Sequence, residues 1–597
     1  MKSRALAAVT ASVVSVLSVL SVSSVPAYAQ DTTFTRADTL RGTIGPERAW
    51  WDVTFYDLDV AVLPADSSIT GRVGVVFEVT EPGAADRTMQ IDLQRPLVVD
   101  SVIRGDQSLA HRRDGNVVWV DVPEVGPVGR IDTVVVYYHG RPRVAVNPPW
   151  DGGFAWKTDD RGRWHIATAN QGLGASVWWP TKDTQTDEPD SQRIAITVPD
   201  PLVNVSNGRL RHVRPHDDGT TTWEWFVANP INNYNVAVNA GRYAHFGHVM
   251  EGEAGMLTLD YWPLEQNLER AREQFAQTPS VIACFEHWFG PYPFYDDGVK
   301  LVETPHLGME HQSGTAYGNQ YRNGYLGRDL SGTGLGLEWD FIIVHELAHE
   351  WWGNSITTAD LADMWVHESF GNYAESLYVE CLHHPAAGAR YVRGTRRAIQ
   401  NDRPIIPDFG VNAEGSGDMY YKGGNMLHTL RQILDDRDAW RSILRGLQST
   451  FRHSIVTGAQ VRAFIDERVP TDLGPVFRQY LETTDIPVLE VRAVDGPDSG
   501  RLAYRWTGVV DGFAMPVDVV LDGEDAPGVE DAQGAEDAQG DGACTRLHPT
   551  TDWQTVEHEL DAITAFDVSR DYYVRVRTPG PEGPVTGIAG ATCGDSR

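Results

Sequence analysis

Cysteine and lysine are both scarce in this chain. Four cysteines among 597 residues are too few to form the framework of a small disulfide scaffold. Lysine supplies five of the 50 basic residues, so the other 45 are arginine. Past the first thirty residues, no apolar run is long enough to span a bilayer, so we expect no stable membrane insertion there.

Acidic residues, in contrast, are abundant. The 82 acidic side chains give a formal net charge of −32, which argues against a phosphate-binding basic face and hence against nucleic-acid binding. Either a GC-rich coding bias or adaptation to high salt accounts for the preference for arginine, and the excess of aspartate favours the salt explanation. With 41% hydrophobic residues, the chain can bury several cores, which excludes disorder throughout.

The first 29 residues have the features of a secretory signal peptide. Lys2 and Arg4 precede an apolar stretch from Ala5 to Val25, and Ala27-Tyr28-Ala29 is typical of a small-x-small cleavage site. A permanent anchor is the weaker alternative, because serines dilute the apolar stretch. The sequence therefore predicts export to a periplasmic or extracellular compartment.

Hydrophobic patterning changes twice along the chain. Alternation with a period of two predicts strands at residues 51–245, helical spacing dominates the middle third, and short strands return after about residue 487. We therefore expect a multidomain α+β protein with an N-terminal β-sheet domain, a mainly helical domain and a small C-terminal β sandwich. The predicted boundaries are 30–247, 248–485 and 486–597.

The four cysteines and an acidic repeat each allow more than one interpretation. Cys544 and Cys593 lie in the same predicted domain and could be bridged, whereas Cys284 and Cys381 are expected to be buried thiols. The acidic stretch 522–542 contains a near-duplicate, 528–533 and 534–539. A calcium site is one interpretation of this stretch, and a solvated loop is the one we favour.

A short motif in the middle third points to metal chemistry. His345-Glu346-Leu347-Ala348-His349 lies in a helix predicted over residues 338–352, where a spacing of four places both imidazoles on one face. Eighteen residues separate His349 from Glu368, on a second predicted helix. Two histidines and one carboxylate leave a zinc coordination position open, which is typical of catalytic rather than structural sites.

These residues predict hydrolysis of an amide bond. We expect one zinc ion per chain, held by His345, His349 and Glu368. Glu346 then serves as the general base that accepts a proton from water and passes it to the leaving amine. Upstream, Glu310 in Leu307-Gly308-Met309-Glu310-His311 is a candidate carboxylate for a free substrate ammonium, with an exposed charged turn as the alternative.

On these motifs the chain resembles the aminopeptidase N family of zinc peptidases, which includes leukotriene hydrolase. His345–Asn354 is similar to the family's zinc signature, Asp363–Glu375 to the segment that carries the third ligand, and Tyr420–Gly423 to its Tyr-x-Lys-Gly element. Residues 230–234 also resemble a segment of the family's first domain. The resemblance implies a thermolysin-like catalytic domain and no helical fourth domain after the C-terminal β sandwich.

The resemblance also implies roles for individual residues. Tyr420 corresponds to the tyrosine that stabilises the oxyanion, and Gln171 to a second amine anchor. Gly308, Met309 and Glu310 match the family's Gly-x-Met-Glu-Asn motif, in which Gly308 and Met309 are expected to bind substrate beside the amine-anchoring Glu310. The chain departs from that motif at two places, Leu307 and His311.

The sequence therefore predicts an exported zinc aminopeptidase that acts on peptides with a free N-terminus. One alternative is an endopeptidase with the same metal site. Another is a non-catalytic binding protein on a peptidase scaffold, which the full set of ligands and the base disfavours. No feature of the sequence indicates the oligomeric state or the preferred N-terminal side chain.

Overall fold

The structure of the protein is a computed structural model that describes residues 33–494, 501–520, 544–557, 567–580 and 583–588. The predicted signal peptide at 1–29 and the acidic stretch 522–542 lie outside the described residues, as does Cys593. Two short helices, α1 (Arg36–Gly42) and α2 (Pro46–Ala49), precede the first strand.

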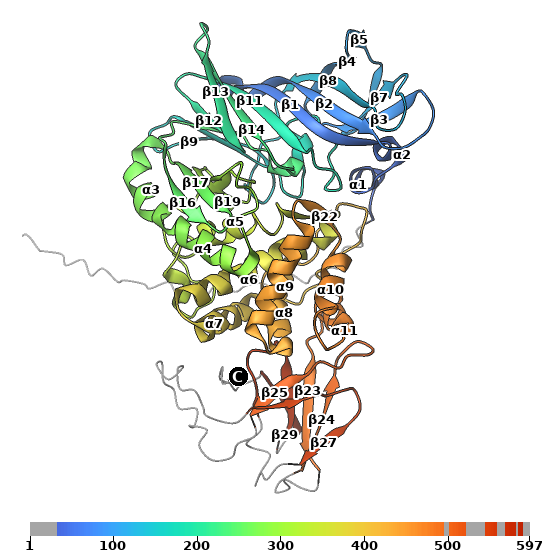
Figure 1. The fold of residues 1–597 in the computed structure, drawn as a ribbon, viewed down its shortest axis with the longest axis vertical. Helices are drawn as coiled ribbons and strands as arrows, with labels where there is room; N and C mark the ends of the chain where they lie inside the picture. The colour runs from blue at the N-terminus through green and yellow to red at the C-terminus, as the bar shows by residue number, and fades with distance from the viewer. Residues whose placement is uncertain (1–32, 495–500, 521–543, 558–566, 581–582, 589–597) are drawn as a thin grey trace, which may run out of the picture. The chain divides into compact units, whose positions relative to one another are not determined.

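An eight-stranded sheet dominates the N-terminal region, coloured blue to green in Figure 1. Along its long strand β1, Tyr56, Leu58, Val60 and Val62 are buried while the residues between them are partly exposed, which is the alternation that one buried face requires. The strand order is β13-β14-β11-β1-β2-β8-β4-β5, with β1 (Trp51–Leu63), β2 (Ser68–Val79), β4 (Val98–Arg104), β5 (Gln107–Ser108), β8 (Ile131–Gly140), β11 (Ser191–Pro199), β13 (Arg209–Pro215) and β14 (Thr220–Val227).

Two smaller sheets complete this region. One has the order β3-β7-β6 and the other β12-β15-β10-β9; their strands are β3 (Arg87–Asp92), β6 (His111–Asp114), β7 (Val117–Val122), β9 (Gly153–Thr158), β10 (Trp164–Ala169), β12 (Val203–Val205) and β15 (Asn239–Gly241). Ala169, at the end of β10, packs with Met309 and Ala316 in a small buried cluster. This cluster joins the N-terminal region to the edge of the next sheet and positions the turn that carries Gln171.

The middle region begins with a five-stranded sheet in the order β16-β17-β18-β20-β19. Its strands are β16 (Phe246–Gly252), β17 (Gly255–Trp262), β18 (Val299–Glu303), β19 (Gly308–Met309) and β20 (Thr315–Tyr317). The edge strand β19 pairs antiparallel with β20, Gly308 opposite Tyr317 and Met309 opposite Ala316. Leu307, the departure from the family motif, therefore does not prevent the motif from forming an ordered edge strand.

Helices make up the rest of the middle region, which confirms the predicted mixed α+β class. They are α3 (Leu268–Gln274), α4 (Thr278–Phe289), α5 (Phe341–Ala348), α6 (Trp365–Leu382), α7 (Pro385–Thr395), α8 (Tyr421–Leu434), α9 (Arg437–Phe451), α10 (Gly458–Asp466) and α11 (Gly474–Glu482), with a small parallel pair β21 (Ile356–Thr358) and β22 (Ser454–Val456). Every residue of α6 from Trp365 to Glu380 is buried, so α6 is the central helix of the region.

Helix α5 is shorter than the 338–352 stretch that the sequence predicts as helical. Asp340 caps its N-terminus by accepting from the backbone N–H groups of Ile342 and Ile343, at 3.1 and 3.4 Å. At the other end the backbone tightens into turns, with Trp351 N–H donating to Ala348 O at 3.1 Å. The ligand histidines therefore occupy the last turn of α5 and its C-cap.

Cys284 and Cys381 form a disulfide, so the prediction of two buried thiols was wrong. Cys284 lies on α4 and Cys381 near the end of α6, with a Cα–Cα distance of 6.1 Å. The two cysteines are 97 residues apart in the chain, and only the packing of α4 against α6 brings them together. None of the cysteines in the described part of the chain is free.

The C-terminal region contains two sheets, in the orders β27-β24-β23-β29-β30 and β26-β25-β28. Their strands are β23 (Val488–Ala493), β24 (Arg501–Thr507), β25 (Val517–Val520), β26 (Cys544–Leu547), β27 (Gln554–Glu557), β28 (Asp567–Val568), β29 (Arg575–Gly580) and β30 (Gly583–Ile588). Among the described helices, none combines the length and the hydrophobicity that crossing a bilayer requires.

Candidate metal centre and adjoining pocket

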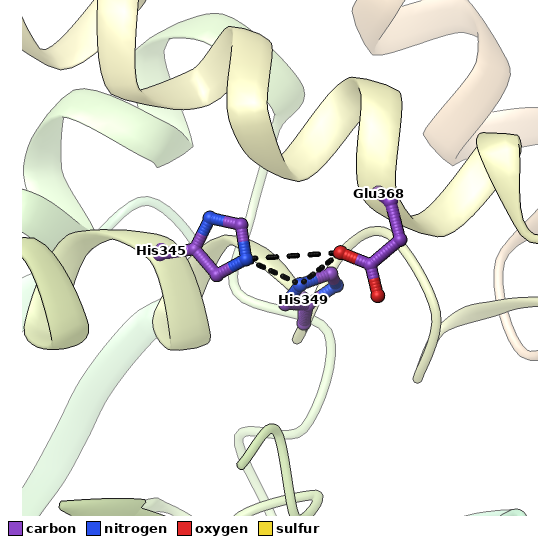
Figure 2. Close-up of side chains that lie close together, drawn as sticks. All are labelled: His345, His349 and Glu368. Atoms are coloured by element: carbon purple, nitrogen blue, oxygen red, sulfur yellow. Dashed lines mark hydrogen bonds and ion pairs between the residues drawn. The ribbon is translucent and has the colours of Figure 1, made fainter. Parts of the chain in front are cut away.

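Helices α5 and α6 bring three metal-ligating side chains together (Figure 2). His345 Nε2 lies 3.3 Å from His349 Nε2, and Glu368 Oε2 lies 3.7 and 3.5 Å from these two nitrogens. All three side chains are buried, and this is the one group among the described residues whose ligand atoms converge in this way. The predicted ligand set is therefore assembled as one cluster.

The remaining atoms of the cluster are consistent with a bound zinc ion. His345 Nδ1 is 2.9 Å from Glu375 Oε1, and His349 Nδ1 is 2.8 Å from Trp352 O, so each ring has its second nitrogen engaged and its Nε2 directed at the cluster. Glu368 Oε2 is buried and makes no hydrogen bond to the described residues. A buried, unsatisfied carboxylate oxygen facing two imidazole nitrogens fits a cation.

The charges of Glu368 and the two histidines stabilise one another. Burial disfavours ionisation of Glu368, but the neighbouring His349 and His345 lower the pKa of its carboxyl well below the ordinary value. Burial likewise lowers the pKa of His349, yet the Glu368 carboxylate more than compensates and raises it to about 9. Glu368 is therefore a carboxylate paired with the imidazoles, and a bound cation would take the place of the imidazole proton.

Glu346, the predicted base, lies on α5 between the two histidines and lines the adjoining cavity. Burial raises the pKa of its carboxyl to about 7, against the opposing effect of His345. Gly308 packs directly on it: a Cβ at that position would lie 2.5 Å from Glu346 Oε1 and 2.9 Å from Ile342 Cγ2. Glycine is thus required where β19 passes the base.

The cavity beside these residues has a volume of about 370 Å³. All nine residues that the sequence predicts for the site line it: Gln171, Gly308, Met309, Glu310, His345, Glu346, His349, Glu368 and Tyr420. Aromatic and aliphatic side chains form much of the remaining wall, among them Trp150, Tyr325, Leu330, Phe341 and Tyr421. The described residues that line the cavity include no arginine or lysine.

Glu310 is held by two donors from the N-terminal region. Its Oε1 accepts from Gln171 Nε2 at 2.8 Å and from the Tyr234 hydroxyl at 2.9 Å. The same Gln171 nitrogen lies 3.2 Å from Glu368 Oε1, so one amide links the predicted amine anchor to a predicted metal ligand. Burial raises the pKa of Glu310, although the charge of His349 opposes this.

Tyr420 immediately precedes α8, with its ring centroid 6.0 Å from that of His345. Burial and the surrounding carboxylates, Glu368 first among them, raise the pKa of its phenol well above the ordinary value. The hydroxyl therefore stays protonated and available as a donor. Lys422, two residues on, points elsewhere: its Nζ donates to Thr483 O at 2.8 Å.

His311 replaces the asparagine of the family motif and is fully buried. Neither of its ring nitrogens has a hydrogen-bond partner among the described residues, and burial lowers the pKa of the ring to about 3. The ring is therefore neutral. The backbone of the neighbouring Glu310 is bonded by a different side chain, since Asn354 Nδ2 donates to Glu310 O at 2.9 Å.

Four residues of the site were not assigned a role from the sequence. Tyr234 bonds Glu310, Glu375 orients His345, and Asn372 and Tyr391 hold Glu375 through hydrogen bonds of 3.1 and 2.8 Å. A signal for Tyr234 was present, because residues 230–234 resemble a family segment. Glu375 lies two helical turns after Glu368 on the face of α6 that meets α5, a spacing that could have identified it.

Comparison with known proteins agrees with this geometry. Residues 308–480 match the model of the peptidase family M1 domain. The chain is 26% identical over 468 residues to aminopeptidase N of Lactococcus lactis subsp. lactis, a match that covers 74% of this chain and 52% of the relative. It is 25% identical over 251 residues to leukotriene A-4 hydrolase of Xenopus laevis, covering 40% of this chain and 38% of that protein. The chain thus matches about half the length of the first relative and less of the second.

Solved structures show the same fold. An M1 zinc metallopeptidase from Deinococcus radiodurans superposes with a TM-score of 0.62 at 20% identity, over 73% of this chain and 95% of that one. A point mutant of the Deinococcus enzyme, bound to the substrate Tyr-Ser-Ala, superposes with a TM-score of 0.60 at 19% identity, over the same shares of the two chains.

Proposed function

We propose that the chain, whose residues 308–480 match the peptidase family M1 domain, is a zinc-dependent aminopeptidase that removes N-terminal residues from peptides. The observation that carries the proposal is the position of Glu310. Its carboxylate lines the same cavity as the three ligands and the base, and Gln171 bonds both Glu310 and Glu368. An α-ammonium held there would belong to the residue whose carbonyl is cleaved.

Each residue has a distinct role in the proposed reaction. His345, His349 and Glu368 would hold a zinc ion, which would supply Lewis acidity towards the substrate carbonyl and the attacking water. Glu346 accepts a proton from the attacking water and delivers it to the leaving amine. Tyr420 donates a hydrogen bond to the oxygen on which negative charge develops.

The amine anchor sets the direction in which the substrate lies. Glu310 pairs with the ammonium, and the side-chain Oε1 of Gln171 is left to accept from it because Nε2 of the same amide is engaged with Glu310 and Glu368. An endopeptidase needs the chain to continue past this point. The buried Glu310 carboxylate, fixed by two donors, disfavours that alternative, because it would then face no cation.

Export is part of the proposal. It is supported by the predicted signal peptide and by the Cys284–Cys381 disulfide, since such bonds persist in oxidising compartments. Fractionation of cells that express the full chain, followed by mass analysis of the N-terminus, tests it. We expect mature protein that begins at Gln30 outside the cytoplasm, and intact chain retained in the cytoplasm would refute export.

Activity is tested with a panel of aminoacyl-anilides offered with and without an N-acetyl group. We expect turnover of the free-amine substrates, loss after chelation, recovery on adding zinc, and no turnover of the acetylated series. Equal cleavage of both series would establish an endopeptidase. Absence of any turnover in zinc-loaded protein would favour a binding protein on a peptidase scaffold.

A further inference from the structure

One carboxylate of the cavity has no part in the proposed reaction. Glu414 lies in an irregular segment before α8 and lines the cavity together with Glu310, Glu346, Glu368 and Glu375, whose roles are accounted for above. Within the described part of the chain, Glu414 forms neither a hydrogen bond nor an ion pair, and its side chain packs against the cavity wall while staying open to solvent. It is therefore free to meet a ligand.

Glu414 lies at the amine end of the cavity. A Cβ on Gly172 would be 2.6 Å from Glu414 Oε1, and Asn412 Nδ2 donates to Gly172 O at 3.1 Å. Gly172 directly follows Gln171, which bonds Glu310. The backbone at Gly172 has φ +73°, so the glycine meets both a left-handed conformation and the close approach of Glu414.

Trp150 borders the same end of the cavity from a segment of the N-terminal region. Its indole is 65% exposed, an unusual state for a tryptophan, and it lines the cavity beside Pro149. The turn that carries it packs on the Gln171 turn, because a Cβ on Gly152 would lie 2.9 Å from Leu173 Cδ1 and 3.3 Å from Ala169 O. An exposed indole and an unpaired carboxylate therefore flank the amine anchors.

No cationic side chain among the described residues that line the cavity pairs with Glu414. A bound metal ion offsets Glu368, and the substrate ammonium offsets Glu310. Partial burial and the nearby Glu368 raise the pKa of Glu414, which Arg403 and Arg41 counteract without forming an ion pair with it. A second positive charge on the first residue of the substrate would meet this carboxylate, and its alkyl stem and cationic group would fit an indole face.

We infer that Glu414 and Trp150 select peptides whose first residue has a cationic side chain, lysine or arginine. The inference rests on the proposed aminopeptidase function and names its substrate class. Glu414 acts on the side chain of the first residue, whereas Glu310 acts on its α-ammonium.

Norleucine is the probe that isolates the charge, because it has a linear alkyl chain like that of lysine but no ammonium. We expect wild-type kcat/KM to favour lysyl- over norleucyl-anilide by about tenfold or more. Glu414→Gln should lower that ratio about tenfold, and Trp150→Leu about threefold. Asp408→Asn removes a charge from the same segment without touching the cavity, and it should leave the ratio unchanged.

Two outcomes would overturn the inference. Unchanged kcat/KM values for both substrates in Glu414→Gln show that the carboxylate does not sense the side chain. An equal fall for both substrates shows that it acts on the α-ammonium instead.

A binding measurement separates this inference from the proposed function. If no anilide is cleaved, the aminopeptidase proposal fails. Calorimetric titration of Glu346→Gln protein with lysinamide and norleucinamide still measures charge selection. We expect lysinamide to bind about tenfold more tightly, and the difference to vanish in the double variant Glu346→Gln/Glu414→Gln. Equal affinities for the two amides would refute the inference.

Discussion

The metal side and the amine side of the cavity are built in different ways. The three proposed metal ligands and the proposed base come from α5, its C-cap and the start of α6, all within residues 345–368. The amine side joins Gln171 and Tyr234 to Glu310, which are 139 and 76 residues away from it in the chain. One side therefore follows from helix geometry, whereas the other exists only when the N-terminal sheets are packed on the middle region.

This difference predicts separable defects. Changes on the metal side should abolish the chemistry whatever the substrate, because they remove the base or the ion. Changes on the amine side should alter how substrates are chosen and held. The following substitutions test that separation, from the largest expected effect to the smallest.

Glu346→Gln and His349→Ala should both abolish turnover of aminoacyl-anilides, by about a thousandfold or more, because a general base alone contributes about 10²- to 10⁴-fold. They should differ in metal content. Glu346→Gln keeps all three ligands and should retain zinc, whereas His349→Ala should lose it. Turnover and elemental analysis of the purified proteins check both statements. Near-wild-type turnover in Glu346→Gln would remove Glu346 from the mechanism.

Glu310→Gln should lower kcat/KM for free-amine substrates about a hundredfold, because the substrate ammonium then loses its buried partner. Zinc content should stay at the wild-type level, since Glu310 is not a ligand. Steady-state kinetics with free and N-acetylated anilides make the measurement. The amine-anchor assignment is wrong if the variant keeps the full preference for free amines.

Glu375→Gln should weaken zinc binding about tenfold to a hundredfold, because the carboxylate fixes His345 through its Nδ1. Competition with a chelator of known affinity measures this. Turnover at saturating zinc should recover most of its wild-type value, which distinguishes an orienting residue from a catalytic one. A wild-type zinc affinity would show that His345 needs no such partner.

The sequence predicts the metal side almost completely and the amine side in part. A spacing of four on a helix fixes where His345 and His349 point, and no tertiary information is needed for that. Glu310 is a candidate carboxylate already before the family resemblance, whereas Gln171 follows from that resemblance alone. Tyr234 and Glu375 were missed because their roles depend on which residue each one meets across an interface.

Irregular segments and helix packing limit prediction further. Glu414 and Trp150 lie outside helices and strands, so no periodicity marks their direction. The Cys284–Cys381 bridge depends on the packing of α4 against α6, which the spacing of the cysteines does not indicate. The three predicted domain boundaries stay predictions, although the class of each region is confirmed.

The smallest effect is expected from Tyr234→Phe. Its hydroxyl donates to Glu310 Oε1 at 2.9 Å, but Gln171 also bonds that oxygen and keeps the carboxylate in place. We expect KM for free-amine anilides to rise about threefold to tenfold with a smaller change in kcat, since a hydrogen bond to a charged group contributes about 1.5–3 kcal/mol and one donor remains. Steady-state kinetics measure the two constants separately.

Tyr243→Phe is the matched control for Tyr234→Phe, because that hydroxyl is also buried and donates at 2.8 Å, but to Glu303 O outside the cavity. Its KM should stay at the wild-type value. Equal changes in the two variants would mean that loss of a buried hydroxyl perturbs the fold in general, and that Tyr234 does not act through Glu310. A KM effect confined to Tyr234→Phe would show that the N-terminal region contributes to substrate binding as well as to stability.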